Sequence, residues 1–78
     1  MKTVEGRVLQ VFQSVLMFPT GLDTDLLKYN QYPGWDSVAH MTIVANLEGE
    51  FDCMLEMQEI LDMSSFEKAL ETMRKYGG

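Results

Sequence analysis

The chain has 78 residues, with 12 Asp and Glu against 6 Lys and Arg, which gives a formal net charge of -6 and a pI near 4.5. This length accommodates a single domain, residues 1–78, and the acidity argues against nucleic acid or an anionic membrane surface as the main partner, because both require a basic face. One cysteine, Cys53, and one histidine, His40, exclude an internal disulfide and a structural Cys/His zinc site. We therefore expect an apolar core to stabilise the fold, and no bound metal.

The sequence has no run of about 18 apolar residues that could form a membrane-spanning helix. Residues 1–7 also lack the uninterrupted apolar stretch of a signal peptide. The unpaired Cys53 fits a reducing compartment. We expect a cytoplasmic monomer that does not insert into membranes.

The first predicted element is a helix that begins at Val4 and ends near Met17 or Phe18. Pro19 and Gly21 predict this end, because proline disfavours a helical conformation at the residue before it. The apolar residues of this helix recur at helical spacing and form one stripe: Val4, Val8, Val11, Phe12, Val15 and Leu16.

The segment from Pro19 to Trp35 shows no long period and predicts a loop of 17 residues. Such a long loop is uncommon in a compact domain. A short helical turn capped by Asp23 or Thr24 fits within it. We expect the aromatic side chains to pin the loop onto the core: Tyr29, Tyr32 and Trp35.

A second helix is predicted to begin after the cap residue Asp36 and to run to about Phe51. At 100° per residue it has two apolar faces. One is a normal core stripe of Ile43, Val44, Leu47 and Phe51. The other is a narrow strip of Val38, Met41 and Ala45, for which two interpretations are open: contact with a neighbouring helix, or docking of a partner protein.

A short third helix is predicted from Glu56 to Leu61, followed by a longer one that Ser64 and Glu67 begin as a capping box. Gly77 and Gly78 predict its end. Its buried stripe is Phe66, Ala69, Leu70, Met73 and Tyr76. The predicted class is all-α, a four-helix bundle with three longer helices, one short third helix and a long loop between helices one and two.

The acidic residues are concentrated in one segment. Residues 36–62 contain no Lys or Arg and seven acids, namely Asp36, Glu48, Glu50, Asp52, Glu56, Glu59 and Asp62. A charge run is usually a solvated face, but a field of one sign also steers basic partners and makes their binding sensitive to salt.

Ser37 is the residue most suited to carry chemistry. It lies one position after the predicted cap, where backbone N–H groups and the helix dipole favour an anion such as a phosphate ester. The alternative is that Ser37 is only part of the cap. His40 lies three residues later, but the sequence has no nucleophile elbow or identifiable triad, so a serine hydrolase is not favoured.

Three segments together resemble an acyl carrier protein: Gly34-Trp35-Asp36-Ser37-Val38, then Leu47-Glu48 with Glu50-Phe51, then Leu61-Asp62-Met63-Ser64-Ser65. The resemblance covers the chain in length, acidity and helix order and is strongest from Gly34 to Tyr76. Val38 replaces the more usual leucine, and Ala39 and Thr42 stand where fatty-acid carriers often have an acid. The Trp-Asp-Ser spelling is similar to stand-alone carriers of specialised pathways.

The resemblance implies that Ser37 receives 4'-phosphopantetheine from coenzyme A through a phosphopantetheinyl transferase, with Asp36 as the adjacent acid. It implies a non-catalytic carrier of acyl thioesters in fatty-acid, polyketide or related biosynthesis, whose partners are acyl-loading and acyl-transferring enzymes with basic docking patches. The positions it implies for partner contact are Val38, Met41, Ala45, Glu48, Asp52, Leu55, Glu56 and Met63. Of these, Leu55 and Met63 match apolar positions beside the acyl chain or the partner. Two alternatives stay open: an aminoacyl or peptidyl carrier, and an acidic adaptor without an arm.

Overall fold

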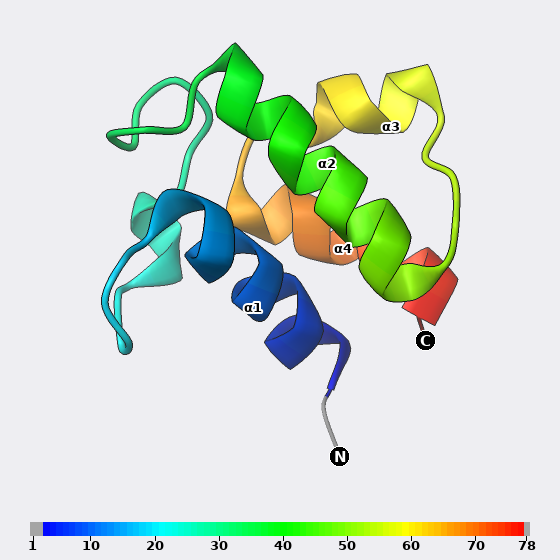
Figure 1. Ribbon diagram of the computed structural model, residues 1–78, viewed down its shortest axis with the longest axis horizontal. Helices are drawn as coiled ribbons and strands as arrows, with labels where there is room; N and C mark the ends of the chain where they lie inside the picture. Colours follow the sequence, from blue (N-terminus) through cyan, green and yellow to red (C-terminus); the bar gives the residue numbers. More distant parts are fainter. Residues whose placement is uncertain (1–2, 78) are drawn as a thin grey trace.

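The structure is a computed structural model that describes residues 3–77. Within this range all regular structure is helical (Figure 1): α1 (Val4–Leu16), the 3-10 helix η1 (Thr24–Leu26), α2 (Ser37–Phe51), α3 (Met57–Asp62) and α4 (Phe66–Gly77). The predicted all-α class, with three longer helices, one short third helix and a long loop after the first, is confirmed. None of these helices is both long and apolar enough to cross a membrane.

Helix α1 begins at a threonine cap and ends at a left-handed residue. The hydroxyl of Thr3 accepts a hydrogen bond from the backbone N–H of Gly6 at 3.0 Å. Met17 has φ 59° and donates its backbone N–H to the carbonyl of Gln13, so the helix ends at Leu16 and Met17 is its C-cap. The stripe is confirmed, with its most buried members at Val8, Val11 and Phe12.

The long loop is ordered by Trp35, whose side chain is only 1% exposed. Its ring meets the ring of Phe12 edge-on at 5.1 Å and that of Tyr29 at 6.2 Å. The backbone N–H of Tyr29 donates to the carbonyl of Ser64, which ties the loop to the segment before α4. Asp23 caps η1 through the N–H of Asp25, as one of the two predicted caps.

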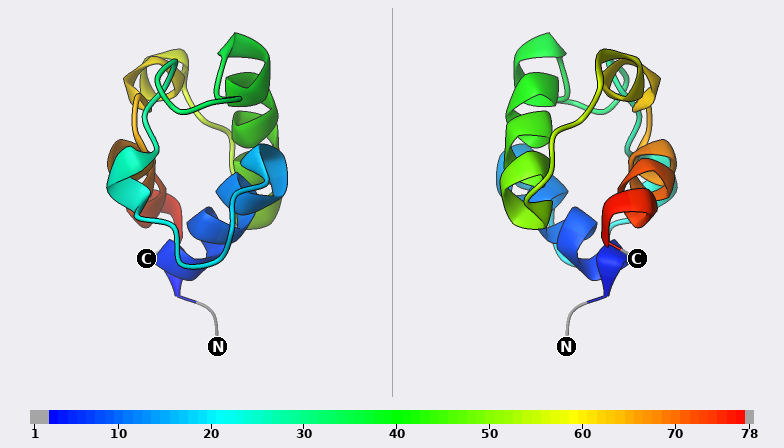
Figure 2. Two further views of the ribbon diagram at one scale, coloured as in Figure 1. Left: turned by 90° about the vertical axis from the view of Figure 1, so that its left-hand side faces the viewer. Right: turned by 90° about the vertical axis from the view of Figure 1, so that its right-hand side faces the viewer.

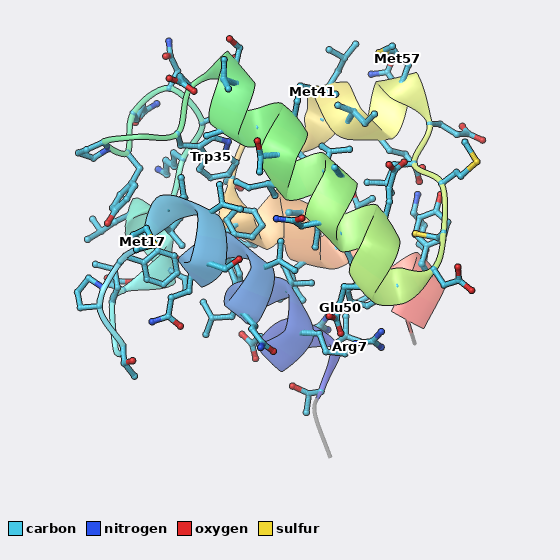
Figure 3. The ribbon with its side chains drawn as sticks, in the orientation of Figure 1. Arg7, Met17, Trp35, Met41, Glu50 and Met57 are labelled. Carbon is cyan, nitrogen blue, oxygen red and sulfur yellow. The ribbon has the colours of Figure 1, made fainter. Side chains whose placement is uncertain are left out.

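Helices α2 and α4 lie on opposite sides of the molecule, with α3 above α4 and level with the upper part of α2, and with α1 across the lower part (Figure 2). The predicted core stripe of α2 is confirmed, because Ile43, Val44, Leu47 and Phe51 are all buried. Arg7 of α1 holds the C-terminal end of α2 (Figure 3): it donates to the carboxylate of Glu50 at 3.0 Å and to its carbonyl at 2.7 Å. The guanidinium also lies 4.1 Å from the centre of the Phe51 ring.

The structure corrects the predictions for the last two helices. Helix α3 begins at Met57, because Glu56 is its N-cap. Glu56 and Glu59 form a capping box, in which the side chain of each accepts a hydrogen bond from the backbone N–H of the other. The side chain that accepts at the start of α4 belongs to Ser65, which bonds to the N–H of Lys68 at 3.1 Å.

The predicted capping box at Ser64 is therefore wrong. The carbonyl of Ser64 accepts the backbone N–H of Tyr29, and the residue after it, Ser65, caps the helix. The helical stripe predicts a buried Tyr76, but the residue is 37% exposed, and its hydroxyl donates a hydrogen bond to Glu59. Gly77 is the last residue of α4, and Gly78 lies outside the described residues.

Candidate functional site

Ser37 is the first residue of α2 and is exposed. The preceding Asp36 is the N-cap. Its carboxylate accepts a hydrogen bond from the backbone N–H of Ala39 at 2.9 Å, and its backbone carbonyl accepts one from the backbone N–H of His40 at 2.8 Å. These bonds fix the first turn of α2 and leave the Ser37 hydroxyl at the helix N-terminus, where an anion is favoured.

The second apolar strip of α2 is exposed. Val38 is 74% and Met41 54% exposed, and Ala45 is also exposed. The interpretation that a neighbouring helix buries this strip is therefore wrong. Figure 3 shows Met41 on α2 and Met57 at the start of α3 along the same edge of the molecule. The strip is available to a ligand or to another protein.

An apolar cleft of about 260 Å³ lies between α2 and α3 and includes Ser37 in its lining. Most of its wall is formed by the aliphatic and thioether side chains Met41, Met57, Ile60, Leu61 and Met63. Its polar members besides Ser37 are Tyr29, His40 and Ser64. The site thus combines an accessible hydroxyl with a neighbouring space suited to a hydrocarbon group.

A larger hollow of about 530 Å³ lies elsewhere, beside the start of α4. It is polar and lined by charged side chains, including Glu5, Asp25, Lys28 and Glu67. Within residues 3–77 no cluster of three or more His, Cys, Asp or Glu is placed to hold a metal ion. The smaller cleft is the better candidate site, because it adjoins the hydroxyl at the start of α2.

His40 lines the cleft but does not serve Ser37 as a base. Its Nδ1 accepts a hydrogen bond from Nε1 of Trp35 at 3.1 Å, and its Nε2 lies 2.9 Å from the carbonyl oxygen of Ile60. Because Trp35 is the donor, the proton of the neutral imidazole is on Nε2 and is donated to Ile60. Both nitrogens are engaged away from the serine hydroxyl, which argues against an activated serine.

Most carboxylates of the acidic segment also support the fold. Glu48 accepts from the backbone N–H of Leu55 at 2.8 Å, and the exposed Glu50 pairs with Arg7. The other exposed acids are Asp36, Asp52, Glu56 and Asp62, of which Asp36, Glu56 and Asp62 accept hydrogen bonds within the fold. Burial, and then the charge of Glu48, raise the pKa of the Cys53 thiol, which makes Cys53 a poor nucleophile.

Glu59 is the most strongly perturbed group near the site. It accepts hydrogen bonds from the N–H of Glu56 at 3.0 Å and from the Tyr76 hydroxyl at 2.6 Å, and it pairs with Lys75 at 2.8 Å. The Glu56 bond contributes most, and together these partners lower the pKa of Glu59 to about 2. The shared bond raises the pKa of Tyr76 to about 12. Glu59 therefore ties α3 to the end of α4.

The predicted partner surface is corrected at two positions. Leu55 is 8% exposed and Met63 1% exposed, so neither can contact a partner directly. Met63 instead lines the cleft, which is the other place that the resemblance implied for it. Glu48 is half-buried and already bonded, whereas Asp52 and Glu56 are exposed.

Sequence reasoning missed the contribution of α3 to the site. Met57, Ile60 and Leu61 line the cleft, yet none of them was singled out. Their spacing of three and four residues places them on one helical face, which was the available signal. Comparisons with protein-family models, with curated proteins and with solved structures gave no match for this chain.

Proposed function

We propose that this protein is an acyl carrier, a four-helix bundle that holds acyl groups as thioesters on a 4'-phosphopantetheine arm attached to Ser37. One observation carries the proposal: the exposed Ser37 hydroxyl lies at the N-terminus of α2 and also lines an apolar cleft. The helix terminus favours the phosphate of the arm, and the cleft is suited to an apolar acyl group.

The residues around Ser37 fit such an arm. Asp36 uses its carboxylate on Ala39, so the cap fixes the serine without covering it. Met41 and Met57 are 54% and 70% exposed, so the cleft has apolar groups at the surface from which a bound chain would exclude water. The arm itself supplies a thiol that keeps an acyl group activated. The protein supplies attachment, shelter and docking, and in this proposal it is not an enzyme.

The surface also fits a protein that binds several enzymes in turn, and we propose that it does so in the cytoplasm. The exposed strip of Val38, Met41 and Ala45 offers a small apolar contact. Exposed acids such as Asp52, Glu56 and Asp62 would attract basic docking patches over a distance. A small, charged contact of this kind permits fast association and quick release, which a carrier requires.

The test is an intact mass measurement after incubation with coenzyme A and a broad-specificity phosphopantetheinyl transferase. The proposal expects a mass gain of one phosphopantetheine group on the wild type and none on Ser37→Ala. Ser64→Ala is the matched control, because Ser64 is exposed and lines the same cleft. It should be modified like the wild type. No gain on the wild type, or an equal gain on Ser37→Ala, would refute the proposal.

A close variant is an aminoacyl or peptidyl carrier, which shares the arm and differs in its cargo. Co-expression with candidate loading enzymes, followed by mass analysis of the thioester, separates the two. The low polarity of the cleft wall favours an uncharged acyl cargo over an aminoacyl group, whose ammonium would lack a carboxylate partner among the described lining residues.

The second candidate function is an acidic adaptor without an arm, which the exposed strip on α2 favours. An adaptor would bind its partner helix equally well as wild type and as Ser37→Ala. It would also stay unmodified in cells that make an active transferase. Modification of the wild type in such cells, and loss of function in Ser37→Ala, would exclude it.

A further inference from the structure

Helix α3 has little buried apolar surface of its own. In the described structure none of its residues is fully buried, although Ile60 packs partly buried against the core and the buried Leu55 and Met63 lie before and after the helix. Hydrogen bonds hold α3 and the loop before it at three points. Glu59 bonds to Tyr76 and Lys75, Glu48 bonds to the N–H of Leu55, and His40 bonds to the carbonyl of Ile60. An element with so little buried apolar surface opens easily, so each bond matters for its position.

The His40 contact joins three parts of the fold. The ring belongs to α2, accepts from Trp35 of the long loop, and donates to Ile60 in α3. The rings of His40 and Trp35 are nearly coplanar, with their centres 6.0 Å apart and an angle of 20° between their planes, as their edge-to-edge hydrogen bond requires, and Tyr29 packs against His40 at 5.1 Å. Trp35 is anchored in the core, so it fixes the orientation of the imidazole. The imidazole in turn fixes the carbonyl that it reaches on α3.

We propose that His40 is a positioning residue that latches α3 to α2 and thereby sets the width of the apolar cleft beside Ser37. A role of the latch in selecting the acyl cargo rests on the proposed function, whereas its role in holding α3 against α2 does not. His40, Ile60 and Ser37 all line the same cleft. A change in the bond between the first two therefore alters the space beside the serine.

The latch requires the neutral imidazole. Protonation at Nδ1 would place an N–H opposite the N–H of Trp35 and leave a buried donor without its acceptor. Among the described residues that line the cleft, none is a carboxylate that could compensate the imidazolium. The nearest acids in sequence are engaged elsewhere: Asp36 with Ala39, Glu59 with Tyr76 and Lys75, and Asp62 with Gln58. The hydrogen bonds of the latch therefore fix the imidazole as the Nε2–H tautomer.

The first test uses the unmodified wild type. Nitrogen NMR of the imidazole should show the Nε2–H tautomer. A scalar coupling between the Trp35 indole nitrogen and His40 Nδ1 should report the hydrogen bond between them. An Nδ1–H tautomer, or the absence of this coupling, would overturn the latch.

The second test measures amide hydrogen exchange in two variants that each keep half of the latch. His40→Asn retains an acceptor near the position of Nδ1 for Trp35 but cannot reach Ile60. We expect exchange in α3 to be roughly tenfold faster, the factor that corresponds to about 1.4 kcal/mol, with the Trp35 indole unchanged. His40→Gln can place its amide nitrogen near the position of Nε2, so α3 should stay protected while the indole resonance moves. Equal exchange in α3 for the wild type and His40→Asn would overturn the proposal.

Glu59→Gln is the matched control, because it loosens α3 through its other contact and should leave the Trp35 indole unchanged. Exchange in α1 should be the same in every variant, which verifies that the core is intact.

A third test loads Ser37 with six- to ten-carbon acyl arms and measures thioester cleavage by hydroxylamine. His40→Asn should shift the best-protected chain length, and an unchanged order would overturn the cargo role. If Ser37 accepts no arm, the proposed function fails, while exchange and tautomer still decide the latch.

Discussion

At the start of α2, Asp36 caps the helix while Ser37 presents an exposed hydroxyl. The Asp36 carboxylate satisfies the N–H of Ala39 at 2.9 Å, and this bond allows the next side chain to stay free in solvent. A helix N-terminus leaves several N–H groups without partners inside the helix. The cap therefore satisfies one of these donors and leaves the others oriented toward the place where a phosphate on Ser37 would lie.

The cap predicts the effect of replacing Asp36. Asp36→Ala should lower the free energy of unfolding by about 1 kcal/mol, because the Ala39 N–H loses its acceptor. Asp36→Asn is the control that keeps an acceptor and should change the unfolding free energy much less. Urea denaturation of the three proteins measures the difference. If Asp36→Ala were as stable as Asp36→Asn, the cap would not stabilise α2.

At the level of elements, α2 has two faces with different tasks. Val44 is 2% exposed and packs in the core, whereas Val38 is 74% exposed on the strip that faces outward. The same side-chain type on one helix thus reports separately on stability and on the proposed docking of a partner.

Truncation of these two valines gives opposite expectations. Val44→Ala should lower the unfolding free energy by roughly 2 kcal/mol, through lost burial and a residual cavity. Val38→Ala should change it by less than about 0.5 kcal/mol, since the side chain is already in solvent. Val38→Ala should instead slow modification by the transferase. A loss of stability in Val38→Ala as large as in Val44→Ala would contradict the assignment of the two faces.

The contact between α3 and α4 predicts a pH dependence. The pKa of Glu59 is lowered from 4.5 to about 2, so at pH between these values the unfolded chain binds more protons than the folded one. The stability that Glu59 contributes is therefore complete above about pH 4.5 and is lost as the pH falls toward 2.

Tyr76 affects stability at alkaline pH. Its pKa is raised from 10.0 to about 12, so the stability that it contributes is lost as the pH rises between these values. Unfolding free energies measured against pH should show a shallower acid limb for Glu59→Gln and a shallower alkaline limb for Tyr76→Phe. Curves for both variants that run parallel to the wild type would show that this contact does not couple to folding.

At the scale of the whole molecule, the segment that contains Ser37 carries charges of one sign. Seven acids and no Lys or Arg lie between residues 36 and 62, while the net charge of the chain is -6. Arg7 pairs with Glu50 and Lys75 with Glu59, so these two acids are partly neutralised. Exposed acids outside these pairs, such as Asp52 and Asp62, are the better candidates for steering a partner.

Neutralising two exposed acids should slow association. The double variant Asp52→Asn with Asp62→Asn should reduce the on-rate for the transferase several-fold at low salt and much less at high salt, because salt screens the field. Glu5→Gln on α1 is the control of the same type outside the acidic segment. Stopped-flow fluorescence measures the rates. An on-rate for the double variant equal to that of the control would contradict steering.

Much of this fold could be predicted from the sequence, because local signals decide it. The stripe of α1, the Asp36 cap and the core face of α2 follow from spacing and cap chemistry, and the structure confirms all three. The shift from Ser64 to Ser65 could not be predicted, since it depends on a backbone bond from Tyr29 in the distant loop. The two bonds of His40 also join residues that only the fold brings together.

The central claim is that Ser37 carries the arm, and one measurement tests it most directly. The protein is purified from cells that make an active phosphopantetheinyl transferase, digested, and analysed by fragment mass spectrometry of the peptide that contains residues 36 and 37. The account predicts a single phosphopantetheine group on the Ser37 oxygen. An unmodified peptide, or the group on another residue such as Ser64, would contradict it.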